Sequence, residues 1–192
     1  MALIYVVQHG EKERSAGDPG LTERGRAQAA LAAERLRGAG LTGVFASPLR
    51  RARETAEPVA AACGLKVRTD ARLTERMNWD ESLPIGAFVE EWARASADRD
   101  FVPSVGDSSR GAGDRFRDFL VEHEGSDEAL AVAAHGGVTV DLLRTLLGDE
   151  SVPEALVREG VPSGAVTTLR GLEVVEIASV SHLGGIESGH RP

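Results

Sequence analysis

Residues 3–10 read LIYVVQHG, an apolar run that stops at a glutamine, a histidine and a glycine. Consecutive apolar residues with β-branched and aromatic members predict a buried strand over residues 3–7, of the kind found inside parallel sheets. Residues 129–137 read ALAVAAHGG and repeat the pattern. The chain therefore contains two predicted buried strands that each lead directly into a histidine and a glycine.

Helix-forming segments alternate with these strands and with several shorter ones. Thr22 is the expected N-cap of the first helix, and Ser47-Pro48 are the expected N-cap and first residue of the second. Helices are predicted over residues 22–37, 47–63 and 85–97, from residue 114 onward, and from residue 138 to 147. Further strands are predicted over residues 43–46, 66–68, 165–169 and 172–177.

This alternation predicts an α/β fold, a three-layer α/β/α arrangement with a mainly parallel central sheet in a single domain. We expect the domain to span residues 1–183. Residues 72–109 are expected to form an irregular excursion over the sheet edge, and residues 184–192 a loose C-terminal tail.

Composition excludes several classes of protein. The 192 residues are 42% hydrophobic and 27% charged, as in ordinary globular domains, and the formal net charge of −8 argues against a nucleic-acid binder. No apolar run approaches the roughly 18 residues of a membrane span, and the first residues lack the basic region of a signal peptide. The single Cys63 excludes an internal disulfide and a multi-cysteine metal site. We therefore expect a cytoplasmic protein without membrane contact.

His9 and His135 are the first candidates for chemistry. Ligands of open α/β sheets bind beyond the carboxyl ends of the strands, where both histidines are predicted to lie. The following glycines let a ligand approach the backbone, and His135 precedes a helix N-terminus, which favours anions. The pair suits phosphoryl transfer, with one histidine as nucleophile and the other polarising the phosphate. The alternative is that each is a structural histidine.

Two other residues become candidate site residues only when they are considered together with the histidines. Arg51 is predicted to lie in the first turn of the second helix, where the helix dipole disfavours a cation. One interpretation is that Arg51 binds phosphate through two hydrogen bonds. The alternative is that it faces solvent. Glu75 taken alone is typical of a solvated surface residue. The glycines form no nucleotide-binding pattern.

Together the motifs resemble the histidine phosphatase superfamily, the phosphoglycerate-mutase-like group. The similarity lies in five blocks that occur in the family's order between residues 3 and 179. The blocks are Gln8-His9-Gly10-Glu11 with Leu21-Thr22-Glu23-Arg24-Gly25, then Ser47-Pro48-Leu49-Arg50-Arg51, Leu73-Thr74-Glu75, Gly106-Asp107-Ser108 and Ala134-His135-Gly136-Gly137-Val138.

The resemblance implies a role for each matching residue. His9 would attack phosphorus and become phosphohistidine, Arg51 and His135 would hold the phosphoryl oxygens, and Glu75 would exchange protons with the leaving oxygen and then with water. Gln8, Gly10 and Gly136 complete the implied phosphate-binding set. The ligand would be a small-molecule phosphate ester or inorganic phosphate, without a metal or cofactor. Oligomeric state is left open.

Three departures from the family pattern bear on activity. Gln8 replaces the family's arginine, the segment from His9 to Leu21 is short and lacks an asparagine, and the span from Glu75 to His135 is modest. The two short segments favour a small, open phosphatase over a phosphoglycerate-mutase-type isomerase. Gln8 motivates the alternative of a catalytically weak or inactive phospho-ligand-binding or scaffold protein of the same fold.

The sequence also suggests which residues replace the positive charge absent at Gln8 and which segments determine substrate specificity. Candidates to replace the charge lost at Gln8 are Arg14, Arg50 and Arg76. Substrate specificity is expected from residues 75–109 and from the loop after Gly148. The expected pocket-lining residues are Glu11, Arg14, Trp79, Glu81 and Ser108.

Overall fold

The computed structural model describes residues 1–186, which form six strands and six α-helices in strand–helix alternation. The strands are β1 (Leu3–Gln8), β2 (Gly43–Ala46), β3 (Val67–Thr69), β4 (Ala129–Ala134), β5 (Val166–Arg170) and β6 (Glu173–Ser179). The α-helices are α1 (Glu23–Leu36), α2 (Arg50–Ala62), α3 (Ile85–Ala97), α4 (Ser109–His123), α5 (Gly136–Leu147) and α6 (Glu154–Glu159). Among these residues no helix is long and apolar enough to cross a membrane.

The sheet has the strand order β3-β2-β4-β1-β5-β6. Strands β3, β2, β4 and β1 run parallel, whereas β5 lies antiparallel to β1 and forms a hairpin with β6. The two apolar strands singled out in the sequence are neighbours at the centre, in a register that sets Gln8 opposite Ala134. The predicted α/β class with a mainly parallel sheet is confirmed.

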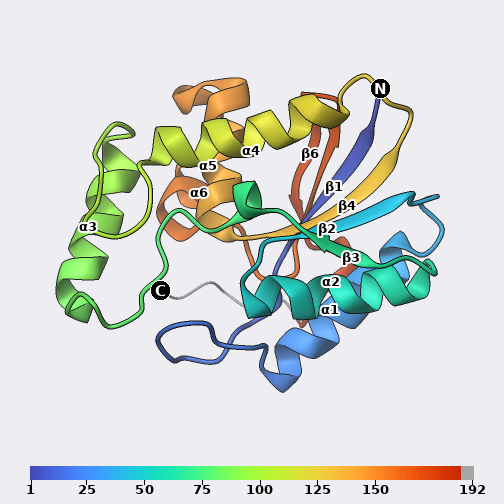
Figure 1. Cartoon of the computed structure of the whole chain (residues 1–192), viewed down its shortest axis with the longest axis horizontal. Coiled ribbons are helices and arrows are strands. Elements are labelled where there is room, and N and C mark those ends of the chain that lie inside the picture. Colours follow the sequence, from blue (N-terminus) through green and yellow to red (C-terminus); the bar gives the residue numbers. More distant parts are fainter. Residues whose placement is uncertain (187–192) are drawn as a thin grey trace.

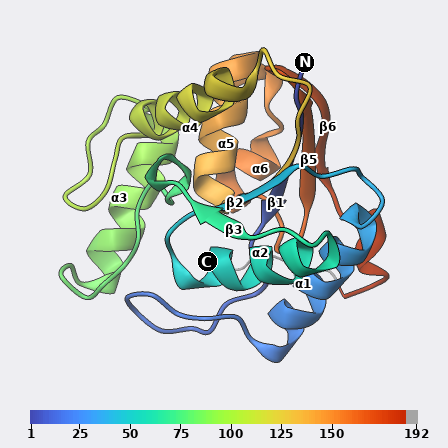
Figure 2. The ribbon, with the colours of Figure 1, turned by 45° about the vertical axis from the view of Figure 1, so that its right-hand side comes forward.

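Helices cover both faces of the sheet, which gives the predicted three layers (Figures 1 and 2). Successive β4 residues alternate between the two cores: Leu130 and Val132 pack with Phe116, Phe119 and Leu142 of α4 and α5. On the opposite face, α1 and α2 approach the sheet through small residues. This second core contains Ala32, Ala33, Ala52, Ala56 and Ala60 beside Ala131 and Ala133. Burial on both faces explains why β1 and β4 are continuously apolar.

The start of α2 differs from the prediction. The helix begins at Arg50 with Leu49 as N-cap, not at Pro48 with Ser47 as N-cap. Ser47 still belongs to the sheet, because its backbone N–H donates to Ala133. A distant carboxylate caps the helix instead, since Asp18 accepts from the backbone N–H of Arg50 at 2.7 Å.

Residues 72–109 carry α3, which lies apart from both helical layers, beyond the carboxyl ends of β1 and β4 (Figures 1 and 2). The next helix, α4, begins at residue 109, earlier than predicted, with Ser108 as its N-cap. Of the expected tail, residues 187–192 lie outside the described residues. Ile186 is anchored, because its carbonyl accepts from Gln28 Nε2 at 2.9 Å.

Candidate active site

The sheet register brings His9 and His135 together. Because Gln8 and Ala134 are paired neighbours, the next residue of each strand emerges at the same carboxyl edge. The two imidazole ring centroids lie 5.2 Å apart with an interplanar angle of 62°. Both rings are buried, so the predicted meeting of the two histidines at the rim is observed.

A hydrogen bond orients the ring of His9. Its Nδ1 lies 2.7 Å from the carbonyl oxygen of Gly10, which is only able to accept, so Nδ1 carries a proton and the neutral form of the ring has its lone pair on Nε2. The backbone N–H of Gly10 in turn donates to Thr55 Oγ1 of α2 at 3.1 Å. A side chain at Gly10 would collide with the backbone of Gly25, so this loop requires glycine.

Arg51 projects from the first turn of α2 and is only 3% exposed. Its Nη2 donates to Asn78 Oδ1 at 3.1 Å, whereas its Nε and Nη1 have no partner among the described residues. Burial lowers the pKa of Arg51, and the carboxylates of Glu75 and Asp18 partly oppose that shift. A buried guanidinium with two unmatched donors is a receptor for an anion.

Gln8 and His135 add further unmatched polar atoms to the same region. In the described part of the chain, neither the Gln8 side-chain amide nor the two ring nitrogens of His135 have a hydrogen-bond partner, and all are buried. Burial, followed by the positive charge of Arg51, lowers the pKa of His135 well below its ordinary value of 6.5. At neutral pH His135 is therefore uncharged, with one N–H to donate.

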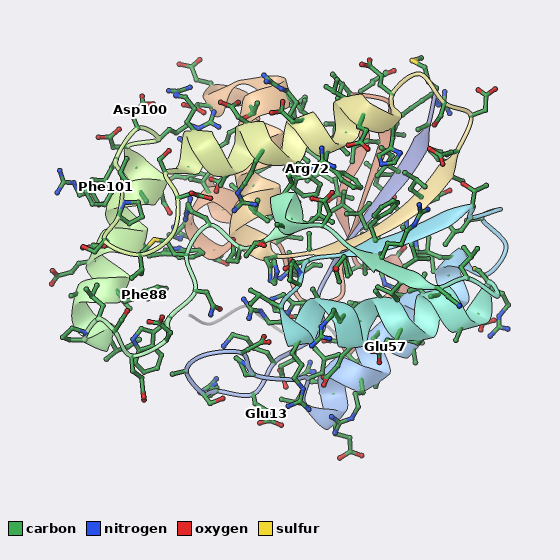
Figure 3. All side chains as sticks on the ribbon, viewed as in Figure 1. Glu13, Glu57, Arg72, Phe88, Asp100 and Phe101 are labelled. Carbon is green, nitrogen blue, oxygen red and sulfur yellow. The ribbon has the colours of Figure 1, made fainter. Side chains whose placement is uncertain are left out.

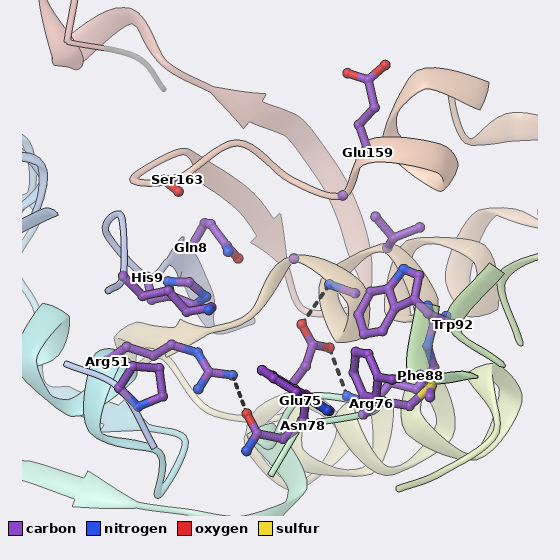
Figure 4. A pocket seen from close by; sticks show the side chains of 18 of the residues that line it. Gln8, His9, Arg51, Glu75, Arg76, Asn78, Phe88, Trp92, Glu159 and Ser163 are labelled. Atoms are coloured by element: carbon purple, nitrogen blue, oxygen red, sulfur yellow. Dashed lines mark hydrogen bonds between the residues drawn. The ribbon is translucent and has the colours of Figure 1, made fainter. Parts of the chain in front are cut away.

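Glu75 is held at the N-terminus of α5. Its carboxylate accepts from the backbone N–H groups of Gly137 and Val138 at 3.0 and 2.8 Å, and from the backbone N–H of Arg76 at 2.8 Å. A Cβ atom at Gly137 would lie 2.6 Å from Glu75 Oε1 and 2.7 Å from the Trp92 ring, so only glycine fits. Figure 4 shows Glu75 between His9 and Arg51 on one side and Phe88 and Trp92 on the other.

Gln8, His9, Arg51, Glu75 and Gly136 line one pocket of about 820 Å³, whereas Gly10 and His135 are not among its lining residues. Two of its lining residues, both labelled in Figure 3, come from distant parts of the chain: Glu13 from the loop after β1 and Phe88 from α3. Of the five lining residues expected from the sequence, Glu11, Arg14 and Trp79 line the pocket. Glu81 and Ser108 do not, and the hydroxyl of Ser108 instead caps α4 by accepting from Gly111 N–H.

The three arginines proposed to replace the charge lost at Gln8 differ in their ion-pair partners and in whether they line the pocket. Arg50 pairs with Glu54 at 2.6 Å on the surface, and Arg76 pairs with buried Asp141. Arg14 lines the pocket, as does Lys12, which sequence reasoning missed although it follows His9 closely in the same loop. Burial and the positive charges of Arg51 and Arg14 lower the pKa of the Lys12 ammonium, so these three cations lie close enough to influence one another.

A second buried polar cluster stands behind Glu75. Arg76 Nη1 lies 2.9 Å from Asp141 Oδ1, which also accepts from Ser109 Oγ at 2.5 Å. The Arg76 guanidinium donates to Ser96 Oγ and lies 4.4 Å from the centroid of the Trp92 ring. Burial raises the pKa of Asp141 to about 6, against the opposing charge of Arg76. The cluster ties α3 to α4 and α5.

Comparisons with known proteins identify the family and the fold. The profile of the histidine phosphatase superfamily, branch 1, matches residues 4–172. The probable phosphoglycerate mutase GpmB of Yersinia enterocolitica is 36% identical over 165 residues, covering 77% of this chain and 76% of that protein. The mycobacterial glucosyl-3-phosphoglycerate phosphatase in complex with inorganic phosphate has a TM-score of 0.71 at 27% identity, covering 93% of this chain and 95% of that one. The phosphoserine phosphatase of Entamoeba histolytica in complex with 3-phosphoglyceric acid shares the fold, with a TM-score of 0.68 at 22% identity over 95% of this chain and 100% of that one.

Proposed function

The chain belongs to branch 1 of the histidine phosphatase superfamily, and from this premise we propose that it hydrolyses small-molecule phosphomonoesters through a phosphohistidine intermediate. A phosphatase among the similar structures supports hydrolase activity in general. The observation that carries the proposal is the group of buried, unmatched polar atoms of Gln8, Arg51 and His135 beside the ring of His9. Such atoms are costly to bury unless a ligand satisfies them, and phosphate has the oxygens to do so.

In the first step, the lone pair of His9 Nε2 forms a bond to phosphorus. The bond from phosphorus to the alcohol oxygen breaks, its electron pair stays on that oxygen, and the carboxyl group of Glu75 supplies the proton. The Gly10 carbonyl, which accepts from Nδ1–H, faces the ring as it gains positive character. Arg51, His135 and Gln8 donate to the phosphoryl oxygens, since phosphoryl transfer depends on positioning and charge stabilisation.

In the second step, a water molecule gives a proton to the Glu75 carboxylate and its oxygen attacks phosphorus. The bond between phosphorus and His9 breaks, and its electron pair returns to Nε2. Splitting hydrolysis through a covalent intermediate replaces one difficult step by two easier ones. A positioned acid and base contributes about 10²–10⁴-fold to the rate.

The test is turnover of p-nitrophenyl phosphate from pH 5 to 8, in EDTA, by the wild type and His9→Ala. We expect metal-independent turnover that His9→Ala abolishes while circular dichroism shows an unchanged fold. Residual activity above a few per cent of wild type would contradict the nucleophile assignment. Binding of inorganic phosphate without turnover of any ester would instead favour the phospho-ligand-binding protein.

A mutase is the second candidate function, because the curated relative named above is a probable phosphoglycerate mutase. A mutase passes the phosphoryl group to an acceptor other than water. Phosphorus NMR of the protein with 3-phosphoglycerate separates the two activities. A phosphatase releases inorganic phosphate, whereas a mutase forms an isomeric phosphoglycerate.

A further inference from the structure

The pocket has an apolar end that the proposed chemistry does not use. Ile85, Phe88, Val89 and Trp92 of α3 all line it and recur at the spacing of one helix face. Such a face usually packs into a core, but Ala95 is the one buried residue within α3. Ile85 is 53% and Val89 52% exposed. An apolar face turned into a pocket is typical of a ligand-binding surface.

The opposite walls of this end are also apolar, and the aromatic wall is preformed. Met77, Trp79, Val140, Leu156 and Val157 line the same pocket. Trp92 is held by the guanidinium of Arg76, and its ring lies 6.2 Å from that of Phe88. None of the charged residues of α3 lines the pocket. The three arginines at this end, Arg76, Arg144 and Arg158, are each paired with a carboxylate, and the partner of Arg158, Glu159, also lines the pocket.

The reaction geometry directs the organic part of a substrate toward this face. In an in-line displacement the leaving oxygen lies opposite the nucleophile, so it departs on the side of phosphorus away from His9. Glu75, which would protonate that oxygen, lies between His9 and Trp92 (Figure 4). The close approach of both Glu75 and Trp92 to Gly137 shows that the acid and the aromatic wall adjoin one another.

From these observations we propose that the α3 face is the subsite for the organic group of the substrate, and that the preferred substrates are phosphomonoesters of apolar alcohols. The inference rests on the proposed phosphatase function for the placement of the leaving group. It separates this chain from the similar structures described above, whose named phosphoesters, glucosyl-3-phosphoglycerate and phosphoserine, have polar organic parts.

Binding of phosphonates tests the subsite without relying on turnover, because their carbon–phosphorus bond is not hydrolysed. Calorimetry would compare methylphosphonate, hexylphosphonate and 2,3-dihydroxypropylphosphonate on the wild-type protein. We expect hexylphosphonate to bind at least tenfold more tightly than methylphosphonate, and the dihydroxypropyl compound to gain less than threefold. Equal affinities for all three would overturn the proposal.

A double variant, Ile85→Asn with Val89→Asn, locates the effect on α3. Both side chains are exposed, so the variant should fold, and the advantage of hexylphosphonate should fall below threefold. Val102→Asn is the matched control, because Val102 is a 69% exposed apolar residue outside the pocket. The control should keep the full advantage, and a double variant that also keeps it would overturn the assignment to α3.

Turnover of hexyl phosphate and glycerol phosphate completes the test, since both leaving groups are alkyl alcohols of similar reactivity. We expect at least tenfold higher kcat/KM for hexyl phosphate. Tight hexylphosphonate binding with no turnover of any ester would overturn the proposed function while supporting the subsite. Turnover of both esters with equal kcat/KM and equal phosphonate affinities would overturn the subsite alone.

Discussion

Two buried arginines, Arg51 and Arg76, lie at the two sides of Glu75, and each is 3% exposed. Arg76 has a buried carboxylate partner, Asp141, at 2.9 Å, and one donor nitrogen, Nε, with no partner among the described residues. Arg51 has an amide partner, Asn78, and two donor nitrogens with no partner in the described chain. The charge of Arg76 is therefore compensated by a carboxylate of the protein, whereas Arg51 has no directly paired carboxylate and can bind an anionic ligand.

The presence or absence of a carboxylate partner is a way to distinguish a structural buried cation from a functional one. Burying a charge is costly unless an opposite charge compensates it. At Arg76 the compensation is internal, and the resulting cluster fixes the position of α3. At Arg51 the carboxylates of Glu75 and Asp18 offset burial only in part. In the proposed function a bound anion supplies the rest, so the phosphate end of the pocket is the part around Arg51, although both arginines line the same pocket.

Exchanging each arginine for glutamine should give opposite results. Arg51→Gln should lower kcat/KM by about 10³-fold with little loss of stability, because it removes transition-state charge stabilisation. Arg76→Gln should lower the free energy of unfolding by about 3–5 kcal/mol at pH 8, because Asp141 is left as an unpaired buried charge. Urea unfolding and ester kinetics measure the two effects.

The comparison would fail if the two variants behaved alike. A large stability loss in Arg51→Gln would mean that this arginine is structural. A 10³-fold activity loss in a well-folded Arg76→Gln would mean that Arg76 contacts the reacting phosphate.

Glu75→Gln should act in a way that depends on the leaving group. Alkyl phosphates need a proton on the departing oxygen, so kcat/KM should fall by about 10²–10³-fold. p-Nitrophenolate departs without one, so the loss on that ester should stay below about tenfold. Paired kinetics on hexyl and p-nitrophenyl phosphate measure the ratio, and equal losses on both would assign Glu75 a positioning role at the N-terminus of α5.

The stability cost of Arg76→Gln should itself depend on pH. Asp141 in the wild type has a pKa raised to about 6, so its protonated form predominates below that value and needs no cation. The cost should therefore be largest near pH 8 and smaller near pH 5. Urea unfolding at both values measures it, and a cost that does not change with pH would mean that Arg76 stabilises through Ser96 and Trp92 instead.

The smallest expected effect concerns Gln8. Its buried amide has no partner among the described residues, and Gln8→Arg would add a charged donor at the phosphate end. A charged hydrogen bond is worth about 1 kcal/mol more than a neutral one, so we expect kcat/KM on p-nitrophenyl phosphate to rise about five- to tenfold. Gln8→Leu is the control and should lower it. No change in Gln8→Arg would mean that Gln8 is tuned to a particular ligand.

Local sequence patterns were enough to predict many of the strands and helices. The runs at residues 3–7 and 129–134 are buried strands because each is apolar on both faces. The helix predicted near residues 85–97 is also present, as α3. The start of α2 was wrong by two residues because Asp18, far along the chain, caps it in place of Ser47. The resemblance implied a proton-transfer role for Glu75 in the same site as the histidines, which no local pattern indicated, and this role stays a prediction.

The α/β class and the two strand–histidine–glycine edges follow from the sequence, because they depend on residues adjacent along the chain. The pairing of Arg76 with Asp141, 65 positions away, and the capping by Glu75 of the helix at Gly137, 62 positions away, arise only when the chain folds. The placement of the apolar face of α3 against a pocket likewise arises only on folding. An amphipathic pattern predicts a helix equally well beside a core or a ligand, and only packing across the whole chain distinguishes them.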